Sequence, residues 1–315
     1  MKKVDIIIIG AGPAGISAGI YAKMDNANYI LIEKNKPCWF LEESINSHYF
    51  TDGFTGIKNK TTGTDLRKML TNHYKRLGGK CIKDTVISIK KINGGFNIKT
   101  KKQDYISKVV IITCGTSPKD IDIQGLKKFK NQIHHFCTID GKQYIGKDVV
   151  VIGGRNSGAA AASYLHDIGC KVSLVEIQDK LQCKEKYQAK LKKRGIKIYT
   201  SAITKEFAGK NSKLEEILIN QKGKDIKIPT SAVFLYIGIK PAIDFCNIKI
   251  DTNYDGYLIV NSENQTSCKG VYAAGDVTTK LKQAITACGD GANAYYHANK
   301  MLSDLNNNKL KYERR

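Results

Sequence analysis

A short apolar run that leads straight into a glycine-rich turn constrains the fold of this 315-residue chain most strongly. Residues 4–9 are dominated by isoleucine and predict a buried parallel strand. Residues 10–15 read Gly-Ala-Gly-Pro-Ala-Gly and open a helix expected over residues 13–24. This strand, turn and helix together predict a Rossmann-type unit with an anion at the N-terminus of the helix.

Each glycine of this turn has its own role. Gly10 makes the tight turn, Gly12 lets backbone N–H groups approach a pyrophosphate, and Gly15 permits close packing of helix against strand. A second strand over residues 29–32 ends at Glu33, where a carboxylate accepts hydrogen bonds from a ribose. The spacing therefore predicts a complete dinucleotide site.

The same plan recurs at mid-chain with one change. A strand over 148–152 precedes a turn that begins at Gly153 and contains Arg155, Asn156 and Ser157, and the next strand ends at Glu176. Arg155 occupies the second glycine position, where a side chain obstructs a pyrophosphate. The fold class predicted is α/β, with two Rossmann-like, doubly wound, three-layer dinucleotide-binding domains.

Composition narrows the cellular setting. The apolar run at residues 4–9 is too short to span a membrane, and no small-residue cleavage site follows it. Nine cysteines are scattered without a C-x-x-C pair or zinc-ligand spacing, so we expect no metal site and a reducing, cytoplasmic location. The net charge of +22 attracts acidic partners, although a lysine-rich composition explains it equally well. No nucleic-acid module accompanies the charge, and neither nucleic acid nor a membrane is expected as a partner.

Several motifs together resemble one flavoprotein family. Residues 273–276 (Ala-Ala-Gly-Asp), followed by residues 282–287 (Lys-Gln-Ala-Ile-Thr-Ala), are similar to the low-molecular-weight thioredoxin reductases. The N-terminal turn, residues 111–115 and residues 236–241 fit the same family, and the match is collinear over nearly the whole chain.

The resemblance implies a discontinuous FAD-binding domain. It would consist of residues 1–118 and 246–315, with an NAD(P)-binding-like domain inserted over 119–245. The polar residues 304–315 predict a disordered tail. The family also implies a homodimer.

The FAD site implied by the resemblance draws on both ends of the chain. Asp276 would lie near the ribityl chain and pyrophosphate. Gln283 and Ala284 would begin a helix whose positive end faces the flavin and stabilises its reduced anion. The candidate cofactor-binding residues are Gly10, Gly12, Pro13, Ala14, Gly15, Glu33, Trp39, Phe40, Cys114, Gly115, Gly275, Asp276, Gln283 and Ala284.

The family's redox dithiol is missing. Anchored on residues 140–141 (Asp-Gly), Ile139 occupies the place of the flavin-proximal cysteine, and Cys137 falls between the two usual positions. A flavin cannot reduce a protein disulfide that is absent, so thioredoxin reduction by this route is disfavoured. Two interpretations of Cys137 stay open: a single redox thiol, or a small buried residue.

The second nucleotide site also departs from the family. The loop after the strand that ends at Glu176 lacks the His-Arg-Arg cluster that grips the 2′-phosphate of NADPH. An acid at this position repels that phosphate and suits a ribose diol. NADPH is therefore not expected; NADH stays open, as does a second adenine dinucleotide. Relatives with comparable changes take electrons from reduced ferredoxin.

The loop beyond Glu33 is rewritten. Cys38, Trp39 and Phe40 stand where the family has Gly-Gly-Gln. Trp39 suits stacking near the isoalloxazine. Cys38 is either a single redox thiol or a structural residue, and His48 is a candidate proton donor to the flavin.

Three functions follow from these features. The first is an FAD oxidoreductase that exchanges electrons with a small acidic protein, ferredoxin or flavodoxin, or with NADH. The second is a disulfide reductase or dithiol oxidase that uses Cys38 or Cys137 singly. The third is a flavin-binding redox sensor or scaffold without turnover.

Overall fold

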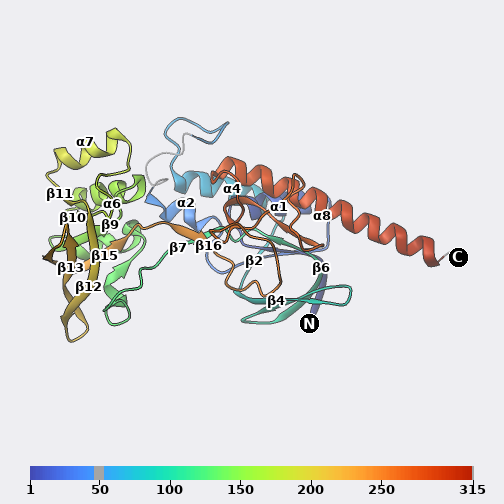
Figure 1. Ribbon diagram of the computed structural model, residues 1–315. Coiled ribbons are helices and arrows are strands. Elements are labelled where there is room, and N and C mark those ends of the chain that lie inside the picture. Colours follow the sequence, from blue (N-terminus) through green and yellow to red (C-terminus); the bar gives the residue numbers. More distant parts are fainter. Residues whose placement is uncertain (46–52, 314–315) are drawn as a thin grey trace. The chain divides into compact units, whose positions relative to one another are not determined.

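The chain folds into two compact units. A computed structural model describes residues 1–45 and 53–313 (Figure 1). The terminal unit contains residues 1–42, 53–117 and 240–313, and the inserted unit contains residues 43–45 and 118–239. Each unit has its own parallel sheet, as expected of a protein with two dinucleotide-binding domains.

The terminal unit is organised around a seven-stranded sheet of order β3-β2-β1-β6-β5-β4, in which β17 also pairs with β6. Parallel pairing joins β3, β2, β1, β6 and β17, whereas β4 and β5 are antiparallel to their neighbours. The strands are β1 (Lys2–Ile9), β2 (Tyr29–Glu33), β3 (Cys81–Lys83), β4 (Val86–Ile92), β5 (Gly95–Thr100), β6 (Asp104–Ile112) and β17 (Val271–Ala273).

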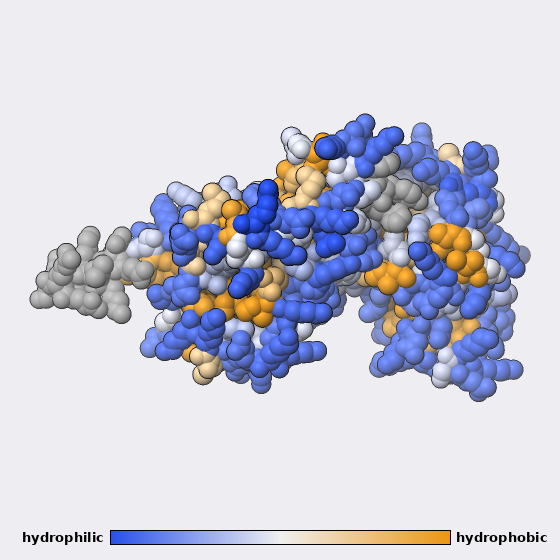
Figure 2. All heavy atoms as spheres, turned by 180° about the vertical axis from the view of Figure 1, so that it is seen from behind, coloured by the Kyte–Doolittle hydropathy of each residue, from blue (hydrophilic) through white to orange (hydrophobic). Residues whose placement is uncertain are grey.

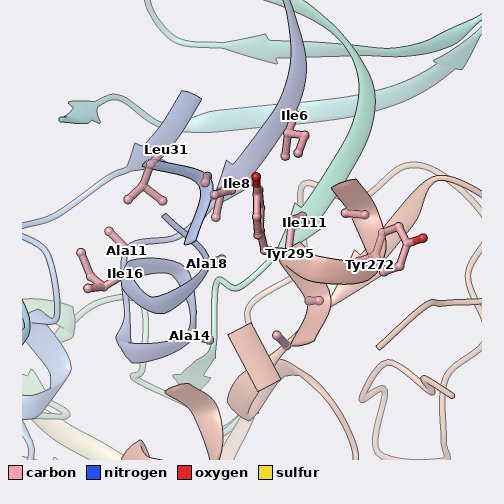
Figure 3. Packing of buried hydrophobic residues seen from close by; sticks show 14 of the residues in the cluster. Ile6, Ile8, Ala11, Ala14, Ile16, Ala18, Leu31, Ile111, Tyr272 and Tyr295 are labelled. Atoms are coloured by element: carbon pink, nitrogen blue, oxygen red, sulfur yellow. The ribbon is translucent and has the colours of Figure 1, made fainter. Parts of the chain in front are cut away.

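Helices cover one face of this sheet. They are α1 (Pro13–Met24), α2 (Trp39–Glu43), α4 (Gly63–Arg76) and α8 (Ala284–Glu313), with a short 3₁₀ turn η3 (Gly275–Val277). Strand β1 is buried on both faces: Ile6 and Ile8 pack toward α1 and α8, where Tyr272 and Tyr295 also lie (Figure 3). Ile7 packs in the cluster on the other face. A strand buried on both faces explains why residues 4–9 are almost uniformly apolar.

The C-terminal segment differs from its expectation in one respect. Helix α8 spans Ala284–Glu313, so residues 304–313 of the expected disordered tail lie within the bounds of the helix. The reason is that residues 292–313 contain neither glycine nor proline. Nothing in the backbone therefore stops a helix that is nucleated by the packing of its first half.

The inserted unit repeats the plan with a five-stranded parallel sheet of order β11-β10-β9-β15-β8. Its strands are β8 (Ile133–His134), β9 (Asp148–Ile152), β10 (Lys171–Val175), β11 (Lys197–Tyr199) and β15 (Ala232–Leu235). Its helices are α5 (Cys137–Asp140), α6 (Asn156–Asp167) and α7 (Glu185–Lys193), with 3₁₀ turns η1 (Lys130–Gln132) and η2 (Gly141–Tyr144).

Two smaller sheets complete the fold. The antiparallel strands β12 (Ala202–Lys210), β13 (Lys213–Gln221) and β14 (Lys224–Pro229) belong to the inserted unit. Strands β7 (Thr116–Pro118) and β16 (Ile239–Pro241) pair where the chain enters and leaves that unit. The predicted class, α/β with two Rossmann-like domains, is confirmed.

The surface is mostly hydrophilic. Figure 2 shows polar and charged residues over most of one face, interrupted by small apolar patches. Within the described part of the chain, every helix is too short or too polar to cross a bilayer.

Candidate functional site

The first glycine turn has the geometry of a phosphate site. Gly10 has a φ of +102°, and its N–H donates to the carbonyl of Ile32 at 2.8 Å. A Cβ on Gly15 would lie 1.8 Å from the Gly10 oxygen, whereas a Cβ on Gly12 would meet nothing nearer than 4.0 Å. Helix α1 carries neither a capping side chain nor an acidic residue in its first turn. Gly12 therefore faces open space at an uncapped helix N-terminus, which suits a pyrophosphate.

Glu33 is held beside this turn by the backbone. The residue is 7% exposed, and its carboxylate accepts hydrogen bonds from the N–H of Ala11 at 2.7 Å and of Asn35 at 2.8 Å. A carboxylate has about four acceptor positions, so two remain for hydroxyl groups. The acid is oriented before any ligand binds and suits the diol of a ribose.

The opposite side of the site comes from the end of β6 and from the C-terminal part of the unit. The hydroxyl of Thr113, which was not among the predicted site residues, donates to the carbonyl of Gly10 at 2.7 Å and ties the turn to the end of β6. Cys114 and Gly115 follow it, with Gly115 at a φ of +64°. Burial raises the pKa of the Cys114 thiol to about 12, so the thiol is neutral.

The loop after β17 contains the last predicted site residues, and Gly275 in this loop lies against α1. Gly275 has a φ of +75°, and a Cβ there would lie 3.1 Å from the Cβ of Ala14. Burial raises the pKa of Asp276, and the ammonium of Lys282 opposes this shift. Helix α8 begins at Ala284, immediately after Gln283. The structure thus gathers residues from both ends of the sequence around the first turn.

Cys38 is a buried residue of the loop that precedes α2. Its N–H donates to the carbonyl of Ala11 at 2.8 Å, and its Sγ lies 3.5 Å from the same oxygen. The side chain is 2% exposed, and burial raises the pKa of the thiol far above its usual value. These contacts favour a structural cysteine over a redox thiol. Trp39 and Phe40 begin α2, with ring centroids 5.8 Å apart in an edge-to-face arrangement.

Cys137 belongs to the core of the inserted unit. It is fully buried, and its N–H donates to the hydroxyl of Tyr236 at 3.1 Å. Burial raises the pKa of the Cys137 thiol to about 12. The structural interpretation is again favoured. His48 lies outside the described residues.

The second turn copies the first except at one position. Gly153 has a φ of +115°, and a Cβ on Gly158 would lie 1.8 Å from the Gly153 oxygen. Arg155 stands before α6 with φ −81° and ψ −178°, while Gly12 stands before α1 with φ −70° and ψ −174°. The two backbones match, and the arginine side chain is exposed at the point where the first turn is open.

The acid of the second turn is also oriented by the backbone. Glu176 is 6% exposed and accepts hydrogen bonds from the N–H groups of Gly154 and Gln178. The following loop folds back over the turn: the Gln182 N–H donates to the carbonyl of Gly154 at 3.2 Å, and the Lys184 N–H donates to Asn156 Oδ1 at 2.9 Å. The sequence predicted Asn156 only as a residue of the second nucleotide site and gave no signal that it anchors this loop. Ser157 is the second residue of α6.

Among residues 1–45 and 53–313, no group of three or more His, Cys, Asp or Glu side chains is arranged to hold a metal ion. All nine cysteines are free thiols.

Two copies of one dinucleotide-binding turn, each after a central parallel strand of its own sheet, define a protein with two dinucleotide-binding domains. The family model described as pyridine nucleotide-disulphide oxidoreductase matches residues 4–291, and the chain belongs to this family.

Individual relatives agree with this assignment. A Clostridium pasteurianum protein described as a 34.2 kDa protein in rubredoxin operon is 33% identical over 309 residues, which cover 96% of this chain and 98% of the relative. The structure of T. acidophilum thioredoxin reductase is 33% identical, with a TM-score of 0.83 over 94% of this chain and 97% of that one. A ferredoxin-flavin thioredoxin reductase from Clostridium acetobutylicum is 25% identical, with a TM-score of 0.54 over 96% and 99%.

The resemblance to thioredoxin reductases is therefore confirmed. The chain is a thioredoxin reductase-like FAD oxidoreductase, and its family implies FAD and a nicotinamide dinucleotide as cofactors.

Proposed function

We propose that this protein is an FAD-dependent oxidoreductase that exchanges electrons with a small acidic redox protein, ferredoxin or flavodoxin. NADH is the second candidate donor, and a C-x-x-C dithiol takes no part. One observation carries the proposal: the two turns share a backbone, but only the first keeps glycine at the phosphate position, and the second carries Arg155.

The terminal unit is proposed to hold FAD. The N–H groups at the start of α1 would bind the pyrophosphate beside Gly12, and Glu33 would accept hydrogen bonds from the ribose. Asp276 would contact the ribityl chain, and the N-terminus of α8 at Ala284 would face the flavin ring. When bound, FAD accepts electrons singly or in pairs and links one-electron to two-electron partners.

The thiols support a route without a dithiol. Within the described residues Cys38 and Cys137 are both buried, and the pKa of each thiol is raised, so neither is held as a reactive thiolate. The alternative, a disulfide reductase or dithiol oxidase that uses one of them, requires a thiolate–flavin charge-transfer band in the reduced enzyme.

Charge and relatives support the acidic carrier. A net charge of +22 increases the encounter rate with an acidic protein and makes that rate depend on salt. One relative is described as a ferredoxin-flavin thioredoxin reductase, and another is encoded in a rubredoxin operon according to its description. The basic charge and these relatives favour an acidic electron carrier.

Glu176 supports NADH over NADPH. Its carboxylate is held by the N–H groups of Gly154 and Gln178 at the proposed ribose position, and a 2′-phosphate bound there would meet a like charge in a buried site. A second adenine dinucleotide in the inserted unit fits the same acid. A homodimer and a reducing, cytoplasmic location complete the proposal, the latter supported by nine free cysteines.

Turnover of an artificial dye acceptor with three donors tests the proposal. We expect FAD-loaded protein to reduce the dye with reduced ferredoxin, more slowly with NADH, and least with NADPH. Efficient turnover with NADPH alone contradicts the proposal. Absence of turnover with every donor would instead support the third hypothesis, a redox sensor or scaffold.

A further inference from the structure

Lys280 is a half-buried residue of the loop after β17, and its side chain joins this loop to the C-terminal helix α8. The Nζ of Lys280 donates to Asp290 Oδ1 at 2.9 Å and to Asn264 Oδ1 at 3.0 Å. The Lys280 side chain is 34% exposed, and that of Asp290 is 13% exposed. An ion pair this close to the interior is screened by solvent much less than a surface pair.

Two asparagines fix the lysine from the other side. Asn264 is fully buried with a φ of +59°, and its Nδ2 donates to the carbonyl of Ala273 at 2.9 Å. Asn293 on α8 donates to Asn264 Oδ1 at 2.8 Å and to the carbonyl of Ser262 at 2.8 Å. Asn264 Oδ1 thus accepts from Lys280 and Asn293 together.

These bonds connect three segments at one place: the turn over residues 261–265, the loop over residues 275–282, and α8. The loop carries Asp276, the helix begins at Ala284, and Gln283 lies between them. Among the described residues, Asp290 Oδ2 is buried and has no hydrogen-bond partner. Asp290 is therefore a largely buried carboxylate whose charge is balanced by one ammonium group.

We propose that Lys280 is a positioning residue of the FAD site: it balances the charge of Asp290 and so fixes the loop that carries Asp276 to α8. This inference rests on the proposed function only in taking FAD as the ligand of Asp276. Lys280 acts on the ligand indirectly. It contacts Asp290 and Asn264, and its ammonium compensates the charge of Asp290.

The electrostatics of Asp276 agree with this role. Burial contributes most to raising the pKa of Asp276; Lys282 lowers it, and Asp290 raises it. The charged and titratable groups that bear on Asp276 are thus Lys282, Asp290 and, on the neighbouring loop, Tyr257. Without Lys280, the charge of Asp290 acts on Asp276 uncompensated. The carboxyl then protonates at a higher pH, and an approaching pyrophosphate meets additional repulsion.

The test measures FAD affinity as a function of pH, without reference to any electron donor. Protein freed of flavin is titrated with FAD between pH 5 and 9, and the quenching of flavin fluorescence gives the dissociation constant. The variants are Lys280→Met, Asp290→Asn and the double variant. Lys300→Met is the matched control, because it removes the same charge from an exposed position of α8.

We expect Lys280→Met to weaken FAD binding about tenfold at pH 7. The loss of affinity toward low pH should begin at a higher pH than in the wild type. Asp290→Asn should move that onset to lower pH, and adding it to Lys280→Met should restore most of the affinity.

Two results overturn the inference. One is a double variant that binds FAD as weakly as Lys280→Met, and the other is an Asp290→Asn variant whose pH profile equals that of the wild type. Lys300→Met should match the wild type. A wild type that binds no FAD refutes the proposed function instead, so the two failures are distinguishable.

Discussion

Replacing Gly12 or Gly15 by alanine separates ligand contact from packing within one turn. A Cβ on Gly15 would lie 1.8 Å from the Gly10 oxygen, far inside the 3.4 Å at which ordinary contact begins, so helix and strand must move apart. Forced overpacking of this kind costs about 1–3 kcal/mol or more. A Cβ on Gly12 meets nothing nearer than 4.0 Å, and the φ of −70° suits any residue. Gly12→Ala should therefore leave the apoprotein unchanged or more stable by about 0.4–1 kcal/mol.

The two variants should behave in opposite ways toward FAD. Gly12→Ala should weaken binding about tenfold or more, because a methyl group keeps the pyrophosphate from charge-assisted N–H bonds worth about 1.5–3 kcal/mol. Urea unfolding of the apoprotein, followed by circular dichroism, measures stability, and flavin fluorescence measures affinity. The reasoning is refuted if Gly12→Ala binds FAD like the wild type, or if it destabilises the apoprotein as much as Gly15→Ala does.

Three further outcomes follow from the site. Arg155→Gly should increase the affinity for NADH about tenfold and the affinity for NADPH only slightly, because Glu176 still repels the 2′-phosphate. Isothermal titration calorimetry measures the two affinities, and equal gains would contradict the role proposed for Glu176. The two-electron-reduced enzyme should show no thiolate–flavin charge-transfer band; a band that disappears in Cys38→Ser or Cys137→Ser would restore the thiol hypothesis. Burial lowers the pKa of His134 from 6.5, while the neighbouring Asp140 carboxylate opposes the shift. As the pH falls, His134 therefore takes up a proton in the unfolded chain at a higher pH than in the folded protein. The free energy of unfolding of the wild type should decrease below pH 6.5, and His134→Gln should lose less stability over the same pH range, as measured by urea unfolding.

The two turns could be predicted from the sequence because their constraints are local. A residue with a Cβ cannot stand at Gly15 or Gly158 without meeting a carbonyl 1.8 Å away. The strand before each turn is buried on both faces and therefore apolar. The alignment of the two turns also predicted that Arg155 replaces the glycine at the phosphate position, and the backbone angles of Arg155 match those of Gly12.

Contacts between distant segments could not be predicted in this way. The position of Cys38 after β2 allowed a redox thiol. The structure buries its side chain against the carbonyl of Ala11, which is 27 residues away in the sequence. The cluster around Lys280 joins three segments by side chains that form no motif. The tail expected from residue 304 overlaps α8 because polar composition indicates solvent exposure, and exposure alone does not end a helix.

Direct reduction of the flavin by an acidic carrier tests the proposed electron route most simply. FAD-loaded protein is mixed anaerobically in a stopped-flow instrument with reduced ferredoxin, reduced flavodoxin, NADH or NADPH, at ionic strengths from about 0.01 to 0.5 M, which span strong and weak screening. We predict that ferredoxin or flavodoxin bleaches the flavin faster than NADPH does, and that this rate falls steeply as salt is added. Rapid bleaching by NADPH alone, or a carrier rate that is independent of salt, would contradict the proposed function.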